Sequence, residues 1–172
     1  MGAETGRQGA MRGESGVQAR RSDMMPTLKQ DLGLFGEQRV VADCACPKCK
    51  RAKTLVRLPP NFKCADVICD FCGYLGQVKA SRVKRLDIVP KAILGAAWGP
   101  QNDRMLAAIY FPLFLVLVDE AWLYSIFYLS ADLQTPAMFK MRKPLSETAR
   151  RAGWQGFIYD LEGVKDRLVR IR

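Results

Sequence analysis

Two pairs of closely spaced cysteines carry the clearest chemical signal in this sequence. The pairs are Cys46 with Cys49 and Cys69 with Cys72, and two residues separate the members of each pair. A tight turn with this spacing directs both thiolates at one ion, and two such turns complete a tetrahedral four-sulfur site. We therefore predict one structural zinc ion, with no open position for catalysis. A redox pair, or plain buried thiols, is the alternative interpretation.

A second polar group flanks the second cysteine pair. Asp66 precedes the pair, and Gln77 and Lys79 follow it. If Cys69 to Gly73 forms the turn of a β-hairpin, Asp66 lies opposite Gln77. Lys79 then shares their face, because alternate residues of a strand point the same way. Such a set suits a metal-dependent phosphodiesterase, in which two oxygen ligands hold Mg²⁺ and a lysine stabilises or helps to generate the attacking hydroxide. From spacing alone, a solvated polar face is the favoured interpretation.

The composition narrows the possible chemistry. The sequence contains no histidine, which excludes Ser-His-Asp and Cys-His catalysis and nucleases that use a histidine base. The N-terminal residues carry no apolar segment of a secretory signal, so we expect a cytoplasmic chain, where paired cysteines favour a metal over disulfides. Cys44 and Cys64 fall outside the paired spacing, and we expect both to be buried thiols.

The charge of the chain suggests a polyanionic partner. The formal net charge of the 172 residues is +10, and nucleic acid is the commonest partner of such a protein, although a generally basic protein is an equally good explanation. The apolar stretch from Met105 to Leu129 is interrupted by Pro112, Asp119 and Glu120, and its uninterrupted part is shorter than the roughly 20 residues of a membrane span. We expect it to form buried core, with no membrane partner.

The elements that must position these residues follow from the hydrophobic pattern. We predict a disordered basic tail over residues 1–27 and one domain over residues 28–172, with mixed α and β structure around one sheet. The predicted strands are Tyr74–Ala80, Phe111–Val118, Ala121–Leu129, Phe157–Leu161 and Leu168–Ile171. The predicted helices are Leu28–Val41, Ala92–Ala108, a short one that opens at Thr135-Pro136 and another that follows Ser146.

One segment near the C-terminus resembles a known family. The run from Arg142 to Trp154, RKPLSETARRAGW, followed by Gln155-Gly156 and Asp160-Leu161, is similar to the DpnI and Dam-replacing family of restriction endonucleases. The order of the cysteine pairs, Asp66 and the lysine motif is similar as well, and together these features cover roughly residues 35–172. The resemblance implies an α/β, mixed-sheet PD-(D/E)xK restriction-endonuclease-like core with an inserted four-cysteine zinc ribbon.

The resemblance also implies an activity and assigns roles. Members cleave double-stranded DNA at GATC sites whose adenine carries an N6-methyl group, with Zn as a structural ion and Mg as the catalytic one. It places Asp66 as the metal-binding aspartate and Lys79 as the catalytic lysine. Gln77 stands where the family has glutamate, so we expect weaker Mg²⁺ binding, because an amide oxygen brings no charge. Glu37 is a candidate for a compensating upstream helical glutamate.

The resembling segment supplies the predicted DNA-binding residues. They are Arg142, Lys143, Arg150, Arg151 and Trp154. Arginine suits phosphates and guanine edges, and the resemblance places Trp154 in a methyl-adenine pocket. The alternative is a basic surface helix with Trp154 in the core. Arg82, Lys84 and Arg85 are predicted either to add phosphate contacts or to form a solvated face.

Two features leave the function open at this stage. The family's winged-helix domain would follow the nuclease domain, and this sequence stops at Arg172. Because Gln77 replaces the family's glutamate, the chain could also be a module that binds methylated DNA but has weakened catalysis. A zinc-stabilised protein-interaction domain is a third possibility. The sequence does not determine the oligomeric state.

Overall fold

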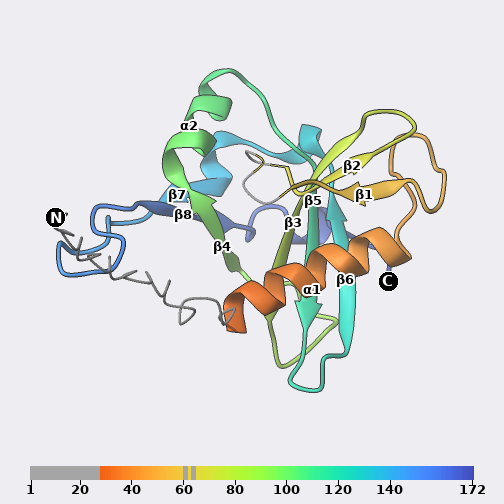
Figure 1. The fold of residues 1–172 in the computed structure, drawn as a ribbon, viewed down its shortest axis with the longest axis horizontal. Coiled ribbons are helices and arrows are strands. Elements are labelled where there is room, and N and C mark those ends of the chain that lie inside the picture. Colours follow the sequence, from red (N-terminus) through yellow and green to blue (C-terminus); the bar gives the residue numbers. More distant parts are fainter. Residues whose placement is uncertain (1–27, 60–61, 63–64) are drawn as a thin grey trace, which may run out of the picture.

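A mixed sheet forms the centre of the computed structural model, which describes residues 28–59, 62 and 65–172 (Figure 1). Within those residues the larger sheet has six strands in the order β1-β2-β3-β5-β6-β9. Their bounds are β1 Leu55–Arg57, β2 Val67–Cys69, β3 Leu75–Arg82, β5 Leu113–Val118, β6 Tyr124–Leu129 and β9 Val169–Arg170. β3 and β5 are parallel, and the other neighbours are antiparallel. The tail predicted over residues 1–27 lies outside the described residues.

The apolar run predicted as a buried strand is β5, and this prediction is confirmed. All six residues of Leu113–Val118 are fully buried, because both faces of the strand meet a hydrophobic core. Leu113, Leu115 and Leu117 enter one core, whereas Phe114, Val116 and Val118 enter the other. A strand buried on both sides gives a continuous hydrophobic run instead of an alternating one. In the described part of the chain, no helix has the length and apolar character to cross a membrane.

A helix covers one face of the larger sheet. α1 runs over Leu28–Asp43, close to the predicted range, and crosses in front of the strands in Figure 1. Val40 is fully buried against Val78 and Val116. A Cβ on Gly36 would lie 2.9 Å from the Cβ of Ala80, so glycine permits the close approach of helix and sheet.

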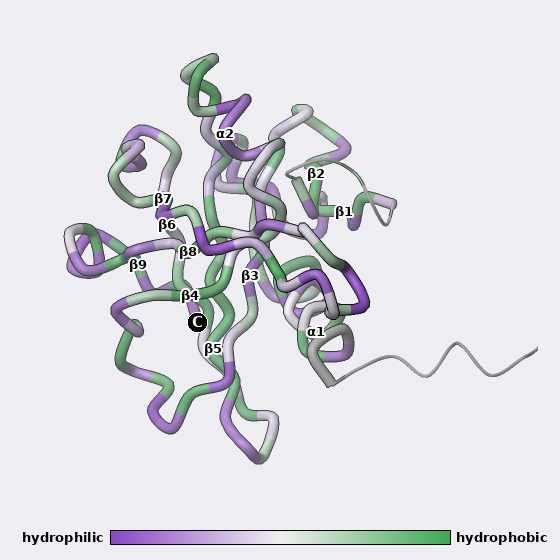
Figure 2. The backbone as a smooth tube through the Cα atoms, turned by 90° about the vertical axis from the view of Figure 1, so that its left-hand side faces the viewer, coloured by the Kyte–Doolittle hydropathy of each residue, from purple (hydrophilic) through white to green (hydrophobic). Residues whose placement is uncertain are grey.

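A second sheet covers the other face, and the expectation of one sheet was therefore wrong. β4 Ala92–Ala97, β8 Gly156–Asp160 and β7 Phe139–Met141 are antiparallel in the order β4-β8-β7. Ile93, Phe139 and Tyr159 point inward and share a core with β5. Figure 2 shows the resulting layers, with α1 on one side of β3 and β5 and the smaller sheet on the other.

Two predicted helices need correction. Residues 92–97 form β4, and only Trp98–Leu106 is helical, as α2. Ile93 is buried while Ala92 and Leu94 are exposed, and this alternation fits a strand. Pro100 lies in the first turn of α2, where no backbone N–H is needed. The helix predicted after Ser146 is absent, because residues 147–153 form turns. Most of these residues are exposed, so a helix there would have no packing face to stabilise it.

The short elements complete the path to the C-terminus. The 3-10 helix η2 Pro136–Met138 begins with Pro136, as predicted. Two further 3-10 turns are η1 Ala131–Leu133 and η3 Lys165–Arg167. The strands predicted near Phe157 and Leu168 are confirmed as β8 and β9; β8 begins and ends one residue earlier than predicted, and β9 is shorter than predicted.

Candidate functional site

The hairpin of β2 and β3 carries the second cysteine pair and the polar set of Asp66, Gln77 and Lys79, whereas Cys46 and Cys49 lie in the loop between α1 and β1. Val67 pairs with Gly76 and Ile68 with Leu75, so the turn between the strands contains the second cysteine pair. Gly73 has a φ of 68° in this turn, a conformation that glycine adopts without steric cost. The predicted hairpin is confirmed, and it places the second cysteine pair at its tip and Asp66 at its base.

The structure brings the four paired cysteines together. The Sγ atoms of Cys46 and Cys72 are 3.6 Å apart, and those of Cys49 and Cys69 are 3.7 Å apart. All four Sγ atoms lie within 4.8 Å of one another. A tetrahedral zinc site with bonds of about 2.3 Å requires sulfur atoms about 3.8 Å apart, whereas a disulfide requires about 2.05 Å. The four-cysteine group could therefore hold a metal such as zinc.

The surroundings of the cluster shift the pKa values of two of these thiols in opposite directions. Burial raises the pKa of Cys46 to about 12. Burial also opposes ionisation of Cys69, but hydrogen bonds with the Thr54 side chain and with the backbone of Cys72 and Phe71 outweigh it and lower the pKa to about 6. A bound dication would ionise the whole set, because coordinated thiols lose their protons.

The two remaining cysteines stand apart from this group. Cys44 is buried, as predicted, and burial followed by the nearby charge of Asp43 raises its pKa to about 12. It does not belong to the four-sulfur cluster. Cys64 lies outside the described residues, so the prediction for it stays a prediction.

At the base of the hairpin, Asp66 and Lys79 form an ion pair. Lys79 Nζ lies 3.4 Å from Asp66 Oδ2 and donates a 2.9 Å hydrogen bond to the carbonyl oxygen of Val78. Asp66 Oδ2 also accepts a 2.7 Å hydrogen bond from the Val78 amide. The side chains of Asp66 and Lys79 are only 26% and 19% exposed, so the pair is partly shielded from water.

Gln77 lies on the same face of β3 as Lys79 but deeper in the molecule. It is 6% exposed, and its Oε1 accepts a hydrogen bond from the hydroxyl of Tyr159 on β8. Carboxylate and amide oxygens are the donors that Mg²⁺ prefers, so Asp66 and Gln77 fit a hard cation. Between them they bring one negative charge, which predicts weaker binding than two carboxylates would give.

Sequence reasoning missed Tyr159. Its position in the apolar strand β8 marks it as an inward-facing core residue, and it is 1% exposed. A buried tyrosine needs a partner for its hydroxyl, and this was the one signal available in the sequence. The identity of the partner depends on how the smaller sheet packs on the larger one.

Glu37 takes a different position from the one expected of a compensating ligand. It lies on α1 and pairs with Arg57 of β1, whose Nε and one terminal nitrogen each lie 2.9 Å from Glu37 Oε2. α1 packs on the face of β3 that carries Val78, opposite the face of Gln77 and Lys79. Among the described residues, no hydrogen bond or ion pair joins Glu37 to Asp66, Gln77 or Lys79.

The predicted DNA-binding residues lie in the long loop between β7 and β8, which extends outward at the left of Figure 1. We name residues 142–155 the basic loop. Its four cationic residues are exposed, and no ion pair within the described residues neutralises them: Arg142, Lys143, Arg150 and Arg151. Backbone hydrogen bonds from Arg142 to Gly156 and from Leu145 to Trp154 hold the base of the loop together.

Trp154 lies at the base of the basic loop and is partly buried. The guanidinium of Arg151 stacks over its ring, 4.6 Å from the centroid. A Cβ on Gly156 would lie 2.8 Å from the indole, so the ring rests directly on that backbone. Trp154 is therefore held by its neighbours while part of its surface remains accessible.

The other predicted phosphate contacts are largely engaged within the protein. Arg82 donates a hydrogen bond to the carbonyl of Asp119 and stacks 3.9 Å over the centroid of Trp122. Arg85 forms two hydrogen bonds with the carboxylate of Asp87. Of the three, only Arg85 forms an ion pair within the described residues.

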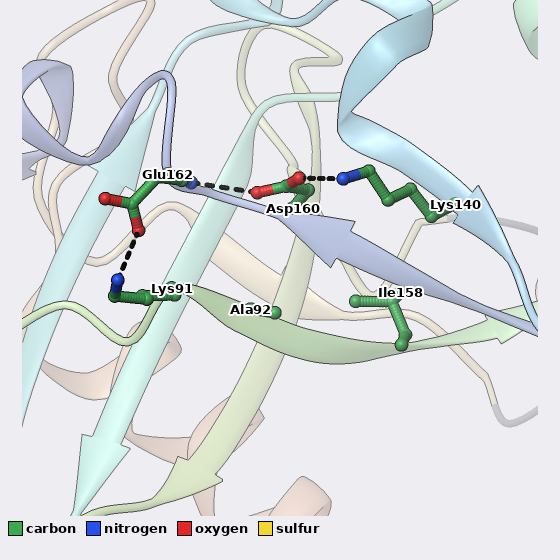
Figure 3. Close-up of a pocket in the computed structure, with 6 residues that line it drawn as sticks. All are labelled: Lys91, Ala92, Lys140, Ile158, Asp160 and Glu162. Atoms are coloured by element: carbon green, nitrogen blue, oxygen red, sulfur yellow. Dashed lines mark hydrogen bonds and ion pairs between the residues drawn. The ribbon is translucent and has the colours of Figure 1, made fainter.

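A shallow hollow of about 460 Å³ lies on the outward side of the smaller sheet (Figure 3). Its two carboxylates are already paired: Asp160 with Lys140, and Glu162 with Lys91 at 3.7 Å. The hydrogen bond from Lys140 is the main cause of the lowered pKa of Asp160. Neither Asp66 nor Lys79 lines this hollow, which is a set of surface ion pairs and not the candidate centre.

The comparison with protein families identifies the chain. Residues 25–169 match the model of DpnI, the Dam-replacing family. The match covers most of the chain, so this protein belongs to that family. It is a family of methyl-directed restriction endonucleases, which act on DNA. The mixed sheet with a four-cysteine ribbon agrees with the nuclease core expected of a member. No curated protein sequence matches the chain.

Proposed function

We propose that this protein is a metal-dependent endonuclease that hydrolyses phosphodiester bonds of double-stranded DNA at GATC-like sites containing N6-methyladenine. The observation that carries the proposal is the ion pair of Asp66 and Lys79 on the β2–β3 hairpin, with Gln77 on the same face. Family membership supplies the class of substrate. The methyl-specific site and the use of Mg²⁺ rest on the family resemblance and on the chemistry of these side chains.

Asp66, Gln77 and Lys79 would have different roles in hydrolysis. Asp66 and Gln77 would hold Mg²⁺, which supplies Lewis-acid polarisation of the phosphate and a lower pKa for bound water. Lys79 donates a hydrogen bond to Val78 O and contacts Asp66, so its ammonium is held at the metal-binding oxygen. From there it orients the attacking water and stabilises negative charge that develops on the phosphate.

The remaining residues support binding. Zinc held by the four paired cysteines would fix the hairpin tip, because a closed tetrathiolate site contributes to folding and not to chemistry. The cations of the basic loop would contact phosphates, and Trp154 would contact the methyl group of the modified adenine. One methyl contributes about 1 kcal/mol, so Trp154 supplies part of the discrimination and other contacts the rest.

Gln77 favours a second candidate function. A neutral ligand weakens metal binding, and a chain of this kind could bind methylated DNA while its cleavage is reduced to a low level. This candidate shares the DNA-binding surface with the first. The two differ only in whether phosphodiester bonds break.

A plasmid assay separates these possibilities. Adenine-methylated and unmethylated plasmid are incubated with the protein and Mg²⁺ or Mn²⁺, beside Lys79→Ala. We expect cleavage of methylated plasmid alone, reduced about 10²- to 10⁴-fold in Lys79→Ala. Intact plasmid with every metal, together with preferential binding of methylated duplex, would establish the binding module instead. Absence of both cleavage and methyl-dependent binding rejects both functions.

A further inference from the structure

A buried hydrogen bond joins the two sheets at the candidate metal site. The hydroxyl of Tyr159 on β8 donates to Oε1 of Gln77 on β3, and the two residues are 82 positions apart in the sequence. They are 1% and 6% exposed, and the neighbours on that face include Leu113, the strand partner of Gln77, which is fully buried. A polar amide in such apolar surroundings needs a hydrogen-bond partner, and Tyr159 supplies one.

The ring of Tyr159 is fixed in place. Its centroid lies 4.9 Å from that of Phe157 and 5.2 Å from that of Phe139, so aromatic rings of β8 and β7 flank it. The hydroxyl therefore has a set position relative to β3. By contrast, the terminal torsion of a glutamine is broad, so the amide of Gln77 has no strong orientation of its own.

We propose that Tyr159 is a positioning residue, which holds the amide oxygen of Gln77 where it can serve as a metal ligand. A carbonyl oxygen has two lone pairs, so one can accept from Tyr159 while the other faces a cation beside Asp66. Without the hydroxyl, the amide can turn by half a rotation and present its NH₂ group, which cannot ligate a metal. The inference rests on the proposed function, because it concerns the same metal site.

A double-mutant cycle tests the coupling between these residues. The zinc-loaded protein is titrated with Mn²⁺ beside the variants Tyr159→Phe, Gln77→Ala and the double variant. Free Mn²⁺ is followed by electron paramagnetic resonance. We expect Tyr159→Phe to weaken Mn²⁺ binding about fivefold, the scale of one hydrogen bond. In the Gln77→Ala background the same substitution should leave Mn²⁺ affinity unchanged, because there is no amide to position.

Tyr128→Phe is the control for a lost tyrosine hydroxyl that is hydrogen-bonded and partly buried. The Tyr128 hydroxyl accepts a 3.1 Å hydrogen bond from Tyr74, and Tyr128 packs against the core on the face of the sheet opposite Gln77. The Tyr128→Phe substitution should lower the melting temperature without changing Mn²⁺ affinity, whereas Tyr159→Phe should change both. Equal Mn²⁺ affinities of wild type and Tyr159→Phe, or an equal effect in the Gln77→Ala background, overturn the inference while the proposed function stands. Failure of the wild type to bind Mn²⁺ overturns both.

Discussion

The β2–β3 hairpin and the basic loop both carry predicted functional residues, yet they are built in opposite ways. In the hairpin, backbone pairing and hydrogen bonds hold each polar group: Asp66 accepts from Val78 and Lys79, and Cys69 contacts Thr54 at 3.3 Å. In the basic loop the cations are exposed, and within the described residues its hydrogen bonds join backbone, hydroxyl and amide groups and not the four cationic side chains. Under the proposed function, the chemistry would use preorganised groups, whereas contact with DNA would use side chains that can adapt to the duplex.

The largest effect is expected when zinc binding at the hairpin tip is prevented. We expect Cys69→Ser, or treatment with a strong chelator, to unfold the protein, because a structural zinc site contributes about 10 kcal/mol or more to folding and a domain is stable by about 5–15 kcal/mol. Zinc content by atomic absorption and thermal melting are the measurements. Cys44→Ala, a buried thiol outside the cluster, should retain zinc and melt at nearly the same temperature. Full zinc content in Cys69→Ser would contradict the assignment.

A smaller effect is expected from Gln77→Glu at the base of the hairpin. A second carboxylate should lower the Mn²⁺ concentration for half-maximal cleavage about tenfold, since the added charge attracts the cation. Without metal the same variant should be less stable by about 2 kcal/mol, because a buried charge then lies beside Asp66. Metal titration of cleavage and denaturant unfolding measure the two effects. Unchanged metal dependence would show that this side chain does not contact the cation.

The smallest effect is expected in the basic loop. Trp154→Ala should reduce the ratio of affinities for methylated and unmethylated duplex about fivefold, the scale of one methyl contact, while the melting temperature changes little. Fluorescence anisotropy with paired duplexes measures the ratio. Trp122→Ala, at the β5–β6 turn against Phe35, is the control and should leave the ratio unchanged. An unchanged ratio in Trp154→Ala would assign methyl recognition to other residues.

The sequence predicted the features that depend on near neighbours along the chain. The spacing of the cysteines indicated the hairpin tip, and the unbroken apolar run indicated β5. It did not predict β4, because Ala92 to Ala97 suits a helix until Ile93 is packed against the second sheet. The contact of Tyr159 with Gln77 also escaped prediction, since it depends on how two sheets stack and not on local spacing.

The contact between Tyr159 and Gln77 also bears on when the proposed metal site can form during synthesis. Pairing within the hairpin involves residues close together in the chain and can form early, whereas β8 joins from a distant segment and long-range pairing is slow. The proposed metal site would therefore be complete only after β8 has been synthesised and the smaller sheet has docked on the larger one. A nascent chain that stops before that point would hold Asp66 and Lys79 but lack the partner of Gln77.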